Sequence, residues 1–180
     1  GITTTIFPDP QQSYTVDTVA GVKEFSAVVG SSKGYPHFYN SAIHYFERAR
    51  DNAVTVVNSQ DGNPSNGTKF NVVNAVYNGG PGAKTIHGVL LNAGEIVLTL
   101  STNHNLQNGD TISIADNSLI FTCTMDNRAT EHAYPRSTDP ASTNTSNLNN
   151  GVLSVTTAGL NGIRVNVGES LSGGFFAPLQ

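Results

Sequence analysis

Short runs of alternating apolar and polar residues, separated by turn-forming residues, dominate the second half of the chain. Alternation is clearest from Thr111 to Ile114 and from Ile163 to Val167, where every second side chain is apolar. Similar runs recur from Thr85 onward, and Asn-Gly, Gly-Asp or Asp-Asn pairs separate them: "IHGVLLN", "EIVLTLS", "DTISIA", "SLIFTCTM", "GVLSVTT" and "GIRVNVG". This spacing predicts an antiparallel β-sandwich or small barrel.

Apolar residues recur at helical spacing in one part of the first half. They are Phe38, Ala42, Tyr45, Phe46, Ala49 and Ala53. Asn40 or Ser41 can cap the start, so the pattern predicts one helix over about 39–52. Strands are expected to follow at 53–57 and 69–77, where β-branched residues cluster.

The segment "NGGPGAK" (78–84) is the strongest break in the pattern, with three glycines and one proline. It predicts a boundary between a mixed N-terminal region, residues 1–82, and a β-module with a C-terminal tail, residues 83–180. The expected fold is therefore mainly β, with one helix in the N-terminal half. The polar stretch from Thr124 to Asn150 is long for a loop, which is typical of functional, assembly-related or mobile segments.

The low fraction of charged residues limits the kinds of partner that the protein is expected to have. Charged residues make up 12% of the chain, against about 25% in an average soluble protein. Amides and hydroxyls must then provide most of the solubility, as in extracellular or assembled β-proteins. A net charge of −4 without a Lys/Arg cluster disfavours nucleic acid as a partner. No apolar run approaches the roughly 20 residues of a membrane-spanning helix, so no membrane span is expected.

The single cysteine, Cys123, limits the available chemistry. It excludes an internal disulfide and a multi-cysteine zinc site. One set of side chains offers the donors that zinc prefers, namely His104, Cys123, Asp126, Glu131 and His132. These residues lack the short paired spacing of metal motifs, and Cys123 alternates with apolar residues as a small buried hydrophobe does. No metal or other cofactor is expected.

Two kinds of catalytic group can be considered from the sequence: a cysteine nucleophile and a pair of carboxylates. Cys123 with His132 could act as a nucleophile and base, but an apolar strand does not supply the electropositive, exposed setting that a reactive cysteine needs. Carboxylate pairs for glycoside hydrolysis would be Asp110 with Asp116, or Asp126 with Glu131. Most of these acids lie beside Gly or Asn, where turn formation explains them better. We therefore expect no catalytic residues.

An aromatic group in the first half could stack on sugar rings if exposed. Its members are Tyr35, His37, Phe38, Tyr39, Tyr45 and Phe46. Helical spacing favours a core position for Phe38, Tyr45 and Phe46. Tyr35 and Tyr39 are then the expected surface anchors.

A longer ordered pattern covers Ile86 to Gly168. "NHNLQNGDTISIADNSLIFTCTMDNRATEHAYPRSTDPA", closed by "GIRVNVG", resembles a β-module that recurs in structural proteins of marine tailed phages, notably those of cyanobacteria and other ocean bacteria. That module has an "H-x-L-x-x-G-D" entry, an "I-A-D-N-S-L-x-F-T-C" strand, a "D-x-x-x-x-x-H-x-Y-P-R-x-T-D-P-A" segment and an "x-V-N-V-G" strand. The resemblance implies a virion component of the tail, fibre, neck or capsid surface, with no catalytic residues.

Three residues of this pattern are expected at an interaction surface. Tyr134 would lay its ring over a strand edge, and Arg136 would pair with Asp139 or with an acceptor on another subunit. The arm "GITTTIF" and the tail "LSGGFFAPLQ" would pair with strand edges of neighbouring copies.

The leading interpretation is a non-enzymatic virion protein that acts through subunit packing, in many copies and with other virion proteins as partners. Two alternatives stay open. One is a receptor- or glycan-binding module that uses Tyr35, Tyr39 and the Asn-rich loops. The other is a virion-associated hydrolase.

Overall fold

The computed structural model describes residues 16–21, 24–27 and 43–169. Tyr35, Tyr39, the segment "GITTTIF" and the tail from 170 onward lie outside these residues, as does the start of the predicted helix. Two strands near the N-terminus, β1 (Val16–Gly21) and β2 (Glu24–Ala27), pair antiparallel and form a two-stranded sheet of their own.

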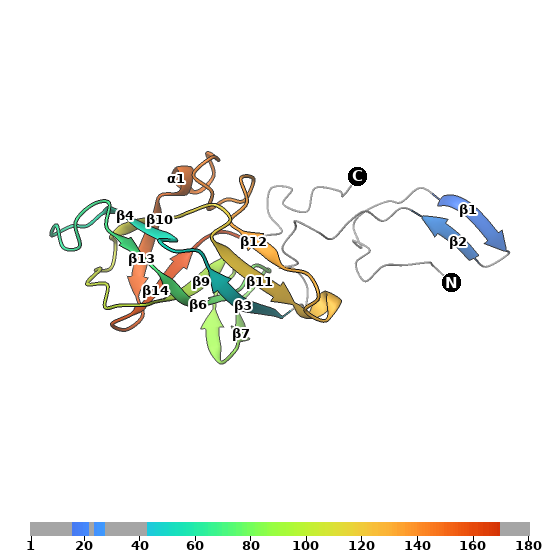
Figure 1. The fold of residues 1–180 in the computed structure, drawn as a ribbon, viewed down its shortest axis with the longest axis horizontal. Coiled ribbons are helices and arrows are strands. Elements are labelled where there is room, and N and C mark those ends of the chain that lie inside the picture. The colour runs from blue at the N-terminus through green and yellow to red at the C-terminus, as the bar shows by residue number, and fades with distance from the viewer. Residues whose placement is uncertain (1–15, 22–23, 28–42, 170–180) are drawn as a thin grey trace.

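An antiparallel seven-stranded sheet forms the body of the molecule (Figure 1). The order across it is β5 (Lys69–Phe70), β4 (Val54–Asn58), β10 (Thr111–Ile114), β13 (Leu153–Thr157), β14 (Gly162–Asn166), β9 (Glu95–Leu100) and β6 (Val72–Tyr77). Sequence neighbours are often not sheet neighbours, because β10 lies between β4 and β13 and β14 lies between β13 and β9. The sheet therefore depends on contacts between distant parts of the chain.

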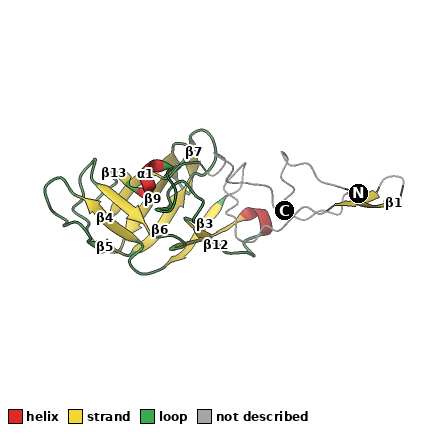
Figure 2. Cartoon of the chain, turned by 90° about the horizontal axis from the view of Figure 1, so that it is seen from above, coloured by secondary structure: helices red, strands yellow, loops and turns green. Residues whose placement is uncertain are grey.

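A smaller sheet and a hairpin complete the body. The three-stranded sheet has the order β12 (His132–Tyr134), β11 (Leu119–Cys123) and β3 (His44–Ala49), and the hairpin consists of β7 (Lys84–Ile86) and β8 (Val89–Leu91). Helical structure in the described residues is limited to one 3₁₀ turn, η1 (Thr124–Asp126), and one short helix, α1 (Leu148–Gly151) (Figure 2). Neither helix approaches the length and apolarity needed to cross a membrane.

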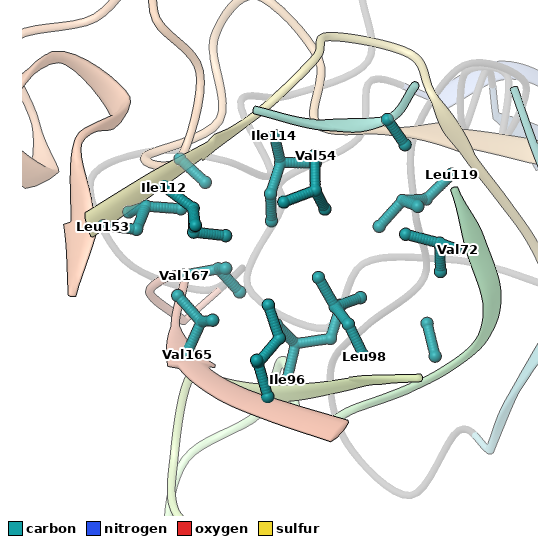
Figure 3. Close-up of a cluster of buried hydrophobic side chains, with 14 of the residues drawn as sticks. Val54, Val72, Ile96, Leu98, Ile112, Ile114, Leu119, Leu153, Val165 and Val167 are labelled. Atoms are coloured by element: carbon teal, nitrogen blue, oxygen red, sulfur yellow. The ribbon is translucent and has the colours of Figure 1, made fainter. Parts of the chain in front are cut away.

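The curled sheet encloses one apolar core (Figure 3). Buried inward positions alternate with half-buried outward ones, as in β9, where Ile96, Leu98 and Leu100 are fully buried. Leu119 and Phe121 of β11 join the same cluster and so attach the small sheet to the large one. The expectation of a mainly β fold with antiparallel, sandwich-like sheets is confirmed.

The predicted helix over 39–52 is wrong where the structure describes it, because His44–Ala49 is strand β3. This strand pairs with β11 in the register Phe46↔Phe121 and Cys123↔His44. Tyr45 and Phe46 are both half-buried. Since both faces of β3 are partly covered, its sequence lacks the alternation that marks a strand covered on one face.

The boundary predicted at 82/83 does not separate two folded units. β6 pairs with β9 and β4 pairs with β10, so strands from both sides of residue 82 belong to one sheet. Val54, Val72 and Tyr77 share a core with Ile96 and Ile112. The glycine-rich segment serves instead as a connection between β6 and the β7–β8 hairpin.

Candidate functional site

Tyr134 does not lie on a surface. Its side chain is 1% exposed and belongs to the main core cluster. The ring packs against Tyr77, with 5.1 Å between centroids, and the two hydroxyls donate to the carbonyl oxygens of Val167 at 3.4 Å and Gly168 at 2.6 Å. Burial raises the pKa of both phenols above the usual range. The prediction that Tyr134 presents an interaction surface is therefore wrong.

Arg136 and Asp139 pair with each other, as one of the two sequence-based options predicted. The Arg136 main-chain N–H, Nε and Nη2 donate to the Asp139 carboxylate at 2.7, 3.2 and 2.9 Å. Asp139 is 1% exposed, and the Arg136 side chain is 14% exposed. The pair thus closes its own loop, and its burial contradicts the predicted role at a subunit surface.

Cys123 and His132 lie on the neighbouring strands β11 and β12 and are both fully buried. Burial raises the pKa of the Cys123 thiol above its ordinary value. The prediction that Cys123 is buried in a strand as a small apolar side chain is confirmed.

The other proposed metal donors serve separate loops. His104 is held between chain segments: its Nδ1 accepts from the Leu106 N–H at 2.9 Å, and its Nε2 donates to the Gly162 carbonyl at 2.9 Å. Asp126 accepts from the Ala129 N–H, and the exposed Glu131 pairs with Arg48 at 2.6 Å. Across the described ranges, His, Cys, Asp and Glu form no group of three able to hold a metal ion.

Asp110 and Asp116, one of the two proposed carboxylate pairs, accept hydrogen bonds that hold loops together. Asp110, which is 1% exposed, accepts the Gln60 N–H at 3.0 Å and the Gln107 N–H at 2.8 Å. Asp116 accepts from the Ser142 hydroxyl at 2.9 Å and from the Asn144 amide at 2.8 Å. Asp110 accepts within its own turn, as the neighbouring Gly and Asn residues predicted, whereas Asp116 accepts from a segment distant in sequence.

A pocket of about 210 Å³ lies between β3 and β6, beside Tyr45, Asn74 and His87. Arg128, the positively charged residue of this lining, already has partners. Its guanidinium lies 4.2 Å from the centroid of the Tyr45 ring and pairs with Glu47 at 2.6 Å. Hydrogen bonds from Thr122 and Arg128 lower the pKa of the Glu47 carboxyl. No sequence pattern predicted this group, because its members come from separate segments of the chain.

A larger pocket of about 350 Å³ lies at one end of the seven-stranded sheet. Three loops form it: the loop after β4, the loop between β9 and β10, and the turn between β13 and β14, all at the left of Figure 1. Its lining is rich in side-chain amides, with Asn63, Asn103, Asn105 and Gln107 joined by Asp61 and Leu160. We call it the amide pocket. The sequence-based interpretation named Asn-rich loops but could not say which of them meet.

No family model, curated protein or solved structure matches the chain. The amide pocket and the smaller pocket beside Tyr45 are two candidate sites that the geometry of the described residues identifies. Of the two, the amide pocket has more uncommitted hydrogen-bonding groups.

Proposed function

We propose that the chain is a structural component of a tailed-phage particle and acts by packing against other subunits. The observation that carries the proposal is how the fold uses the residues of the phage-module pattern. His104 and Asp110 close the loops that enter β10, Tyr134 fills the core, and Asp139 closes the loop after β12. A module in which these four pattern residues build its own fold suits a packing unit better than an enzyme.

The β1–β2 hairpin supports action through packing. It has no third strand among the described residues, so each strand has one edge without a β partner there. An isolated two-stranded hairpin is at best marginally stable in water, and open strand edges readily accept another strand. A neighbouring subunit would provide such a partner.

Low charge points the same way. Weakly charged faces rich in amides and hydroxyls can be buried against one another without stranding unpaired ions. The described ion pairs are few, and Arg48–Glu131 and Arg128–Glu47 lie at least partly exposed. Multi-copy assembly is thus compatible with the composition of this surface.

Two measurements test the proposal: whether purified particles contain the protein, and whether the protein forms oligomers in solution. Purified tailed-phage particles encoding the chain should contain it in many copies, by mass spectrometry and by antibody labelling in electron micrographs. In solution, light scattering should show an oligomer for the full chain and a monomer after deletion of residues 1–27. Absence from purified particles would contradict the virion assignment, and a monomeric full chain would contradict self-packing.

A further inference from the structure

We propose that the amide pocket binds a neutral saccharide, through Asn63, Asn103, Asn105 and Gln107. The inference rests on this pocket alone and does not depend on the phage assignment. Pockets at the open end of a curled sheet are common ligand sites, and about 350 Å³ lies in the usual range of about 300–1,000 Å³.

The side-chain amides of the pocket can form hydrogen bonds with the hydroxyl groups of a sugar. A primary amide offers an acceptor oxygen and two donor hydrogens, so it can accept from one sugar hydroxyl and donate to the next. The Asn63 and Asn105 side chains make no hydrogen bond within the described residues. Asn103 uses only its Oδ1, which accepts the Asn105 N–H at 3.3 Å, and so keeps its NH₂ group.

Hydrogen bonds among its own lining residues hold the pocket in shape. Asp61 Oδ2 accepts from Gln107 Nε2 at 2.8 Å, which joins two of the loops and leaves Gln107 Oε1 as an acceptor. Asp61 Oδ1 accepts from the Asn63 N–H at 3.1 Å and from the Ser59 hydroxyl at 3.2 Å. His104, buried under the pocket, fixes the third loop through Gly159 and Gly162. Such prior ordering reduces the entropy that binding must overcome.

The charges of the lining residues favour a neutral sugar over an acidic one. The described lining contains no lysine or arginine, the groups that recognise phosphate, sulfate and carboxylate. The one acid, Asp61, has both oxygens occupied and would repel an anion. Leu160 is 74% exposed at the rim and offers an apolar surface for the C–H face of a sugar ring. The pocket therefore favours a neutral sugar over a uronate, a sialoside or a nucleotide.

Neutral hydrogen bonds in a partly open pocket predict weak binding at each site, with dissociation constants of about 0.1–10 mM. Copies held together in an assembly would raise the effective affinity by about 10²–10⁴. Weak sites in many copies are a workable way to hold a polysaccharide surface.

The experiment is saturation-transfer NMR on the full chain, with the methyl glycosides of glucose, galactose, mannose, rhamnose and N-acetylglucosamine as probes. Methyl glucuronoside and methyl sialoside serve as the acidic comparison. We expect transfer to at least one neutral glycoside at up to about 10 mM and weaker transfer to the acidic pair. In ¹⁵N-labelled protein, the side-chain NH₂ resonances of Asn63, Asn103 and Asn105 should shift with the same ligand.

Asn63→Ala/Asn103→Ala is the test variant, since both side chains are exposed and their loss leaves the core intact. Its affinity should fall at least about fivefold. Asn147→Ala is the matched control, because Asn147 is an exposed amide outside the pocket, and its affinity should be unchanged. Thermal unfolding of all three proteins checks that folding is preserved.

Several results would overturn the proposal: no transfer to any neutral glycoside, a preference for the acidic pair, equal affinity in the test variant, or shifts confined to other resonances. None of these bears on whether the chain is found in phage particles. The saccharide site and the virion assignment can therefore fail separately.

Discussion

At the scale of single residues, Asp139 organises the loop between β12 and β13. Its carboxylate accepts three hydrogen bonds from Arg136 while almost fully buried. Asp139→Asn keeps the shape of the side chain but removes the negative charge that the Arg136 guanidinium pairs with. We expect the free energy of unfolding, measured in urea, to fall by about 2–3 kcal/mol.

The matched control is Glu131→Gln, which removes the partner of Arg48. That pair has side chains 60% and 51% exposed, so solvent screens it. Its loss should change the urea midpoint little. Equal losses in the two variants would show that burial does not set the strength of the Arg136–Asp139 pair.

One buried thiol and two buried phenols predict that the protein becomes less stable at alkaline pH. Burial raises the pKa of Cys123 above its ordinary 9.0, and the pKa values of Tyr77 and Tyr134 above their ordinary 10.0. The unfolded chain therefore releases these protons at lower pH than the folded chain. It follows that the ionisation of these groups does not change the free energy of unfolding below about pH 8, and that this free energy falls as pH rises through about 9–11.

Urea unfolding at neutral pH and at about pH 10.5 measures this dependence. Cys123→Ala and Tyr77→Phe will lower stability at neutral pH, because they remove buried contacts, but each should flatten the alkaline decline. An unchanged decline in the double variant would assign it to other groups.

The same residues show how far sequence reasoning reaches at this scale. The Arg136–Asp139 pair was predictable because three positions separate its members in a turn-forming segment. The burial of Tyr134 was not, because it depends on Tyr77 and on the Val167–Gly168 backbone, which are distant in sequence. An aromatic ring with a polar tip suits a surface or a core equally well.

At the scale of elements, β3 marks where pattern reading failed. Tyr45 and Phe46 are adjacent, yet both are partly covered: Phe46 packs on Phe121, and Tyr45 lies under Arg128. Apolar residues on both faces imitate helical spacing in a short segment. Pairing with β11, a strand distant in sequence, decides that this segment is a strand. The strands with one covered face, such as β10 and β14, followed their alternation.

Gly94 joins two elements and gives the prediction at this scale. It has φ +77°, and a Cβ there would meet backbone atoms at 2.7 Å in Gly168 and 2.9 Å in Glu169. Those atoms follow β14, while Gly94 precedes β9, so Gly94→Ala would push apart the ends of two paired strands. We expect a loss of about 2–4 kcal/mol in unfolding free energy.

Gly82→Ala is the control, because Gly82 has a similar φ of +73° but nothing within 4 Å of the added Cβ. It isolates the backbone strain of the left-handed conformation, about 1–2 kcal/mol. Thermal unfolding of both variants measures the difference. Equal destabilisation would show that close packing at Gly168 adds nothing.

At the scale of the whole molecule, the amide pocket is a site that could not be predicted from the sequence. Asn63, Asn103 and Leu160 lie on three loops spread over about a hundred residues, and the composition predicted only that such loops are rich in Asn. Their meeting follows from the strand order β4, β10, β13, β14 and β9, which brings the loops to one end of the sheet. That order depends on non-local pairing, which periodicity does not specify.

The shared sheet makes residues 83–180 an incomplete folding unit. Cutting there removes β4 from β10 and β6 from β9, and strips Val54, Val56, Val72 and Tyr77 from the core. Each loss exposes a strand edge and an apolar face, so the isolated fragment should lack a cooperative unfolding transition and aggregate. Deletion of residues 1–27 serves as the control, because it leaves β3 to β14 in place and should preserve cooperative unfolding by circular dichroism. A fragment 83–180 that unfolds cooperatively as a monomer would mean that β9, β10, β13 and β14 close a core without β4 and β6, and that the glycine-rich segment is a domain boundary after all.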